Sequence, residues 1–174
     1  MNNSAQNQTA KILFGLFTGL MSFSLFAQAA NTPSGSGSTK PLLERSKLSI
    51  GAGVSLNSVD GPVNDELGYQ LFAAYKLSQV NLLEGVNSSF EVGYMDYGFD
   101  GVDNDGLWAT YVIDGAISSQ VNWLGRLGFD FGDDSGLMAG IGLAAPINKQ
   151  LQLRMEYVVR DEVDSIQLNL IYKL

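Results

Sequence analysis

The sequence predicts an all-β protein, an eight-stranded antiparallel up-and-down β-barrel that crosses a membrane. Three observations favour this fold. Eight segments of about ten residues alternate apolar and polar side chains, which is the period of a β-strand. The polar face of these segments is rich in glycine rather than in charge. Charged residues make up only 16% of the chain, whereas a typical soluble domain carries about 25%.

The first part of the chain has the pattern of a secretory signal peptide. Residues 1–11 are polar with one basic residue, residues 12–27 are apolar, and Ala27-Gln28-Ala29 has the small-x-small form of a cleavage site. The apolar run is about 16 residues long, shorter than the ~20 that a membrane helix needs. We expect a signal peptide over 1–29, cleaved after Ala29 or Ala30. Residues 30–46, rich in Gly, Ser and Pro, are predicted to form a flexible periplasmic segment.

Residues 47–174 carry the eight alternating segments of the predicted barrel. In the first, 47–57, every even position from 48 to 56 is apolar. The others follow at 67–77, 88–97, 107–118, 121–131, 137–145, 151–160 and 165–174. Ten residues is long for a strand of a soluble protein but fits a tilted strand that crosses a bilayer. An even number of strands lets the sheet close with both ends on one side.

The composition of the two faces decides which face looks inward. Small residues such as Gly51 and Gly93 suit the narrow interior of eight strands, whereas a surface in water would carry more Lys and Glu. We therefore expect Leu48, Ile50 and Leu168 to point away from the barrel axis. The alternative is a soluble periplasmic barrel with its apolar face inside, binding a hydrophobic ligand.

Aromatic residues on the apolar face fall near both ends of the predicted strands. Two such belts are typical of a barrel that meets two membrane–water interfaces. The predicted aromatic girdle consists of Tyr69, Tyr75, Phe90, Tyr94, Trp123, Phe129, Phe131, Tyr157 and Tyr172.

Three stretches resemble the small OmpA/OmpX-like outer-membrane barrels of Gram-negative bacteria: Phe90–Gly98, Leu153–Tyr157 and Ile166–Leu174. The last stretch is similar to the terminal signal read by the barrel-assembly machinery, although this chain ends in Leu174 where the family usually has Phe. The resemblance implies a location in the outer membrane. It also implies outer-membrane lipid and lipopolysaccharide as partners.

Charged residues on the inward face must find partners away from lipid. The candidates pair between or along strands: Asp114 with Arg126, Lys76 with Glu91, and Arg154 with Glu156. These residues are expected to form a polar plug, because eight strands leave no open channel. The alternative is a narrow channel or carrier for small solutes, with the same residues lining its pore.

The segments expected to form outer loops are acidic. They contain Asp100, Asp103, Asp105, Asp133, Asp134, Asp161, Glu162 and Asp164. Residues 103–106 resemble a fragment of a calcium loop but lack the downstream bidentate Glu, so no specific metal site is expected. These carboxylates are predicted to be solvated; a bridge of divalent cations to lipopolysaccharide phosphates is the functional alternative.

Composition excludes several classes of function. The chain has no Cys and no His, which removes disulfides, a thiol nucleophile and a Ser-His-Asp triad. A net charge of −8 argues against nucleic-acid binding. We expect a protein that is not an enzyme and needs no cofactor, although Asp100, Asp103 and Asp105 leave a carboxylate-only enzyme as an alternative. A monomer is expected because closure removes the sheet edges.

Overall fold

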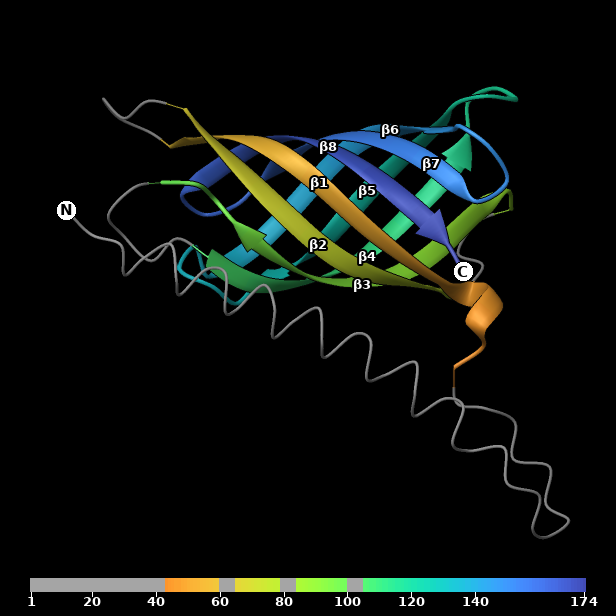
Figure 1. Ribbon diagram of the computed structural model, residues 1–174, viewed down its shortest axis with the longest axis horizontal. Helices are drawn as coiled ribbons and strands as arrows, with labels where there is room; N and C mark the ends of the chain where they lie inside the picture. The colour runs from red at the N-terminus through yellow and green to blue at the C-terminus, as the bar shows by residue number, and fades with distance from the viewer. Residues whose placement is uncertain (1–42, 60–64, 79–83, 100–104) are drawn as a thin grey trace, which may run out of the picture. The chain divides into compact units, whose positions relative to one another are not determined.

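The computed structural model describes residues 43–59, 65–78, 84–99 and 105–174. A short 3-10 helix, η1, precedes eight strands that close into one antiparallel barrel in sequence order (Figure 1). The elements are η1 Arg45–Lys47, β1 Leu48–Val59, β2 Glu66–Lys76, β3 Val86–Asp96, β4 Asp105–Ala116, β5 Asn122–Asp130, β6 Gly136–Pro146, β7 Leu151–Val159 and β8 Val163–Lys173. The predicted all-β, eight-stranded up-and-down barrel is confirmed.

Closure of the barrel brings the first strand against the last. β1 pairs with β8 from Ser49 opposite Lys173 to Val59 opposite Val163.

The barrel has two different ends. At the turn end, where β1 begins and β8 finishes, backbone bonds such as Ile117 N–H to the Val121 carbonyl (2.9 Å) close tight connections. At the opposite, loop end, strands β1, β3, β5 and β7 finish and strands β2, β4, β6 and β8 begin. No helix in the described ranges is both long and apolar enough to span a bilayer.

The apolar face of the strands points outward, as the glycine-rich polar face predicted. Ile50 is 39% exposed and Leu168 is 47% exposed, whereas Phe72 and Met138 on the opposite face are buried. Because strand side chains alternate, the same parity holds along each strand. The alternative of a soluble barrel, in which the apolar face would line the interior, is therefore excluded.

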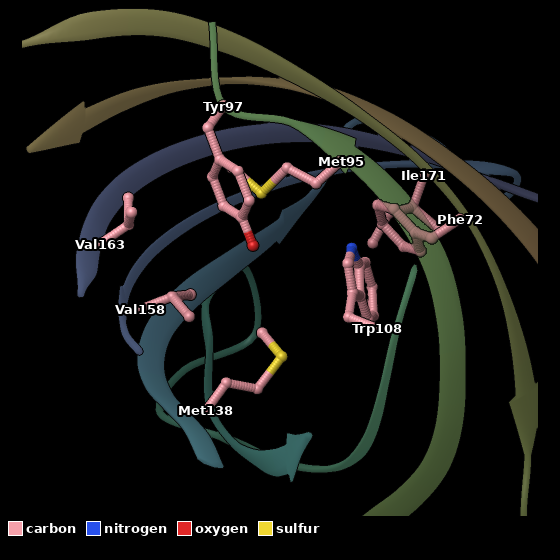
Figure 2. Close-up of a cluster of buried hydrophobic side chains, with 8 residues drawn as sticks. All are labelled: Phe72, Met95, Tyr97, Trp108, Met138, Val158, Val163 and Ile171. Atoms are coloured by element: carbon pink, nitrogen blue, oxygen red, sulfur yellow. The ribbon is translucent and has the colours of Figure 1, made fainter. Parts of the chain in front are cut away.

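Side chains fill much of the interior, or lumen, of the barrel. One buried apolar cluster contains Phe72, Met95, Tyr97, Trp108, Met138, Val158, Val163 and Ile171 (Figure 2). The Phe72 and Trp108 rings pack tilted, with centroids 5.6 Å apart. A Cβ placed on Gly93 would lie 2.5 Å from the Trp108 ring, so this large side chain fits only because its neighbour has no side chain. Val112, Leu124 and Ala144 form a second apolar layer toward the turn end.

Candidate functional site in the lumen

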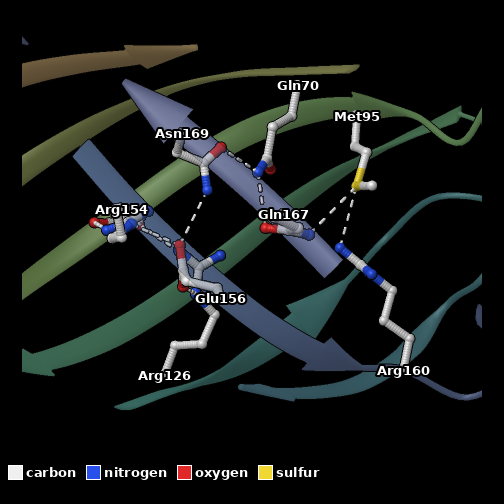
Figure 3. Close-up of polar contacts among 9 residues, drawn as sticks. Gln70, Met95, Arg126, Arg154, Glu156, Arg160, Gln167 and Asn169 are labelled. Carbon is white, nitrogen blue, oxygen red and sulfur yellow. Dashed lines mark hydrogen bonds and ion pairs between the residues drawn. The ribbon is translucent and has the colours of Figure 1, made fainter. Parts of the chain in front are cut away.

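Four inward-facing charges form a closed ring of ion pairs inside the lumen. Figure 3 labels Arg126, Arg154 and Glu156 of this ring. Arg126 on β5 contacts Glu91 on β3 (Nη2–Oε2, 3.1 Å) and Glu156 on β7 (Nε–Oε2, 2.7 Å). Arg154 on β7 contacts the same two carboxylates, Glu91 (Nη1–Oε1, 2.8 Å) and Glu156 (Nε–Oε1, 2.5 Å). We call these four residues the ion cluster; their charges cancel.

The ion cluster is shielded from solvent by aromatic rings and an amide. Its four side chains are at most 4% exposed. The Arg126 guanidinium lies over Trp108 and that of Arg154 over Phe72, with Cζ 5.2 and 5.0 Å from the ring centroids. Asn169 donates a hydrogen bond to Glu156 Oε1 (3.1 Å). Buried charges persist only when they are fully paired, and here each carboxylate contacts both guanidinium groups.

Two of the predicted pairings are wrong. Asp114 does not pair with Arg126: it lies opposite Leu124 near the turn end, where Asn87 and Asn122 donate to its carboxylate (3.1 and 3.3 Å). The Arg126 side chain reaches the other way along the barrel, toward Trp108, because both carboxylates of the ion cluster lie there.

Lys76 likewise does not reach Glu91. Lys76 is exposed at the end of β2 and pairs in register with Ser89, two residues nearer the turn end than Glu91. Glu91 is opposite Ala74 and buried, and two arginines already occupy its oxygens. Arg154 and Glu156, predicted to share a face, do contact each other.

A network of side-chain amides and hydroxyls links β1, β2 and β8 on the loop side of the ion cluster. Gln70 Nε2 on β2 donates to Gln167 Oε1 (2.8 Å) and Asn169 Oδ1 (2.7 Å) on β8 (Figure 3). Ser165 on β8 donates to Asn57 Oδ1 on β1 (2.7 Å). These bonds tie the first two strands to the last from inside the lumen.

A second buried ion pair, which was not predicted from the sequence, lies nearer the loop end. Arg160 Nε contacts Asp130 Oδ2 (3.1 Å), and the Tyr97 hydroxyl donates to the same oxygen. Arg160 also donates to Ser165 Oγ (2.8 Å) and to Met95 Sδ (3.1 Å). The alternation placed Asp130 and Arg160 on the polar face. Asp130 ends β5 and Arg160 directly follows β7, and because these two strands are not consecutive, no local signal paired the two residues.

Asp134 connects two of the acidic loops. Its Oδ1 accepts from the Glu162 backbone N–H (2.8 Å) and its Oδ2 from that of Val163 (3.0 Å). Burial raises the pKa of the Asp134 carboxyl above its ordinary value, although these two N–H groups and Arg160 act in the opposite direction.

The other predicted loop carboxylates are spread along the loop end. Asp105 and Asp133 bond through their backbones (Asp133 N–H to the Asp105 carbonyl, 3.2 Å), and Asp161 is exposed. Asp164 accepts from the Tyr157 hydroxyl (2.6 Å). Asp100 and Asp103 lie outside the described residues. Among the residues that are described, no acidic group is arranged to hold a metal ion.

The nine residues of the predicted girdle lie on the outward face. Near the turn end are Tyr75, Phe90, Trp123 and Tyr172, and nearer the loop end are Tyr69, Tyr94, Phe129, Phe131 and Tyr157. At the loop end the Tyr94 hydroxyl donates to Asp105, and the Phe129 and Phe131 rings stack with centroids 6.4 Å apart. The aromatic rings thus form two separate belts around an apolar middle.

Comparison with solved structures places this architecture among membrane barrels. A de novo designed transmembrane β-barrel is similar with a TM-score of 0.55 and 16% identity, over 74% of this chain and 96% of that chain. The outer-membrane enzyme PagL is similar with a TM-score of 0.53 and 12% identity, over 72% of this chain and 99% of that chain. Neither the family models nor the curated proteins gave a match. The fold is that of the small eight-stranded outer-membrane barrels, as the resemblance in the sequence implied.

Proposed function

We propose that this protein is an outer-membrane barrel whose lumen is plugged, and that it serves envelope integrity or surface contact rather than transport or catalysis. The observation that carries the proposal is the pairing of an apolar outer surface with a neutral, fully buried ion cluster. An outward apolar face between aromatic belts fits a bilayer. A lumen closed by paired charges fits a structural role.

Plugging favours the structural role over a channel. An ion that crossed the lumen would have to displace contacts of 2.5–3.1 Å among four side chains that are at most 4% exposed. The apolar layer of Val112, Leu124 and Ala144 would add a barrier on the turn side. Hydrophobic constrictions exclude hydrated ions.

Two measurements test the proposal together. The refolded protein should migrate differently on an SDS gel before and after boiling, and planar bilayers containing it should show no stepwise conductance. Arg126→Ala should lower the resistance of the barrel to denaturant, whereas Arg45→Ala, an exposed arginine in η1, should leave it unchanged. Regular conductance steps in the parent, or unchanged denaturant resistance together with new conductance in Arg126→Ala, would favour the narrow channel.

Export and assembly complete the proposal. Residues 1–29 act as the signal peptide, residues 30–46 remain in the periplasm, and the barrel-assembly machinery inserts residues 47–174. Outer-membrane lipid and lipopolysaccharide then surround a monomer. N-terminal sequencing of the protein from outer-membrane fractions should begin at Ala30 or Asn31; an uncleaved N-terminus, or recovery without detergent from the periplasm, would contradict it.

A further inference from the structure

The pairing of β1 with β8 differs from the other strand pairings of the described barrel, because it joins the first strand to the last. Each of the other pairings joins strands that are consecutive in the chain, so a connecting segment limits how far one strand can slip past the next. β1 and β8 are far apart in the sequence, so the contacts between them must select their register.

The outward side chains of this seam do not distinguish one register from another. Val54 on β1 lies opposite Leu168 on β8, and the next outward residues along β8 are Ile166 and Leu170. A slip of two residues keeps every side chain on its own face of the sheet. It would place Ile166 or Leu170 opposite Val54, which again pairs one aliphatic side chain with another.

The lumen side of the seam is specific, because two amide side chains meet over Gly53. Gly53 on β1 lies opposite Gln70 on β2 and opposite Asn169 on β8. Gln70 Nε2 donates to Asn169 Oδ1 (2.7 Å) across this glycine and to Gln167 Oε1 (2.8 Å), as Figure 3 shows. All three amides are at most 1% exposed. They need the space over the glycine, since a Cβ on Gly53 would overlap the side-chain oxygen of Asn169.

A slip of two residues in either direction breaks this arrangement. In one direction Asn169 would lie opposite Gly51, where the Phe72 ring already fills the space that a Cβ would take. In the other direction Ile171 would lie opposite Gly53, and the buried amide of β2 would face an apolar side chain. Buried amides that lose their partners are unfavourable, so both slipped alignments are disfavoured from inside the lumen.

We propose that Gln70, Gln167 and Asn169 form a register lock, which selects the one alignment in which β8 closes on β1. Register sets the stagger of the strands in a closed barrel and with it the width of the interior. Asn169 also donates to Glu156 (3.1 Å), so the lock holds β8 in the alignment in which the ion cluster is complete. The lock belongs to the barrel itself and does not rest on the proposed function.

Disulfide cross-linking measures this register directly, because the chain has no cysteine of its own. Val54→Cys with Leu168→Cys reports the native alignment, since opposite Cα atoms lie about 4.5–5.5 Å apart, within reach of a disulfide. Val54→Cys with Leu170→Cys reports the slip that Phe72 does not block, because residues offset by two are about 7–8 Å apart in the native alignment. Each pair is oxidised after the protein has refolded in lipid vesicles, and mass spectrometry gives the cross-linked fraction.

The lock variant combines Gln167→Ala with Asn169→Ala, which removes both acceptors of Gln70. It should raise the ratio of slipped to native cross-link at least about tenfold, the effect of losing two buried hydrogen bonds. Gly93→Ala is the matched control: it disturbs lumen packing against Trp108 but keeps all three amides, so it should leave the ratio unchanged.

Three results would overturn the proposal. An unchanged ratio in the lock variant would mean that other contacts select the register. An equal rise in Gly93→Ala would mean that any loss of stability loosens the seam. A slipped cross-link as abundant as the native one in the protein with its amides intact would show that they do not act as a lock, and this result stands even where the lock variant does not fold.

Discussion

Replacing Glu91 by Gln should destabilise the barrel strongly, because this carboxylate joins both arginines of the ion cluster. Glu91 accepts one bond from Arg126 (3.1 Å) and two from Arg154 (2.8 and 3.0 Å). Glutamine keeps the shape and one carbonyl oxygen, but its NH₂ group faces a guanidinium and can accept nothing. The site is left with one excess positive charge away from water.

The size of the effect follows from the kind of interaction that is broken. Removing one partner of a buried ion pair costs about 3–5 kcal/mol, and we expect Glu91→Gln in that range. Arg154→Gln should cost a similar amount, since it leaves Glu91 with Arg126 alone. The double variant removes one charge of each sign and leaves the two-point contact of Arg126 with Glu156 (2.7 and 3.0 Å) intact. It should therefore cost at least about 1 kcal/mol less than the two single variants added together.

The assay is equilibrium unfolding in urea or guanidinium of protein refolded in lipid vesicles, followed by tryptophan fluorescence. One of the two tryptophans, Trp108, lies under Arg126 and adjoins the ion cluster. Glu84→Gln, at an exposed position of the turn end, is the control and should stay within about 0.5 kcal/mol of the parent. A cost below about 1 kcal/mol for Glu91→Gln, or a cost of the full sum for the double variant, would contradict this role of the ion cluster.

Two further predictions concern packing and the loops. Gly93→Ala should lower the free energy of unfolding by about 1–3 kcal/mol, because the new Cβ would lie 2.5 Å from the Trp108 ring. Gly125→Ala is the control: the nearest atom beyond its chain neighbours would lie 3.8 Å from its Cβ, so it should be neutral or stabilising in the same unfolding assay. Equal effects of the two variants would contradict this account of lumen packing. Asp134→Ala should speed hydrogen exchange of the Val163 amide about tenfold or more, because the amide loses the carboxylate oxygen to which it donates (3.0 Å); unchanged exchange would mean that the carboxylate does not hold the loop.

The barrel fold and the outward direction of its apolar face could be predicted from the local alternation of apolar and polar residues. Alternation of side chains is a property of each strand by itself, so the segment around Ile50 shows its two faces without reference to any other strand. Glycine on the polar face then indicated a narrow interior, and Phe72 and Met138, which break the polar pattern, do lie in the lumen. Trp108 could have been assigned to the lumen by the same parity, since it alternates with outward Leu107 and Ala109.

Which charged residues pair with each other inside the lumen depends on the closed barrel and could not be predicted from the sequence. Glu91 and Arg154 are 63 residues apart on β3 and β7, strands that do not neighbour each other in the sheet. Their contact requires closure of the barrel, which makes strands on opposite sides of the lumen face each other. It also requires a long arginine side chain, which can extend in either direction along the barrel. Arg126 contacts Glu91 and Glu156 rather than Asp114, because the electrostatic free energy is lowest where two carboxylates and two guanidinium groups lie together in one buried space. Strand alternation fixes only the side of the sheet on which a charge lies, whereas its partner depends on distances across the interior that exist only after the eight strands have closed.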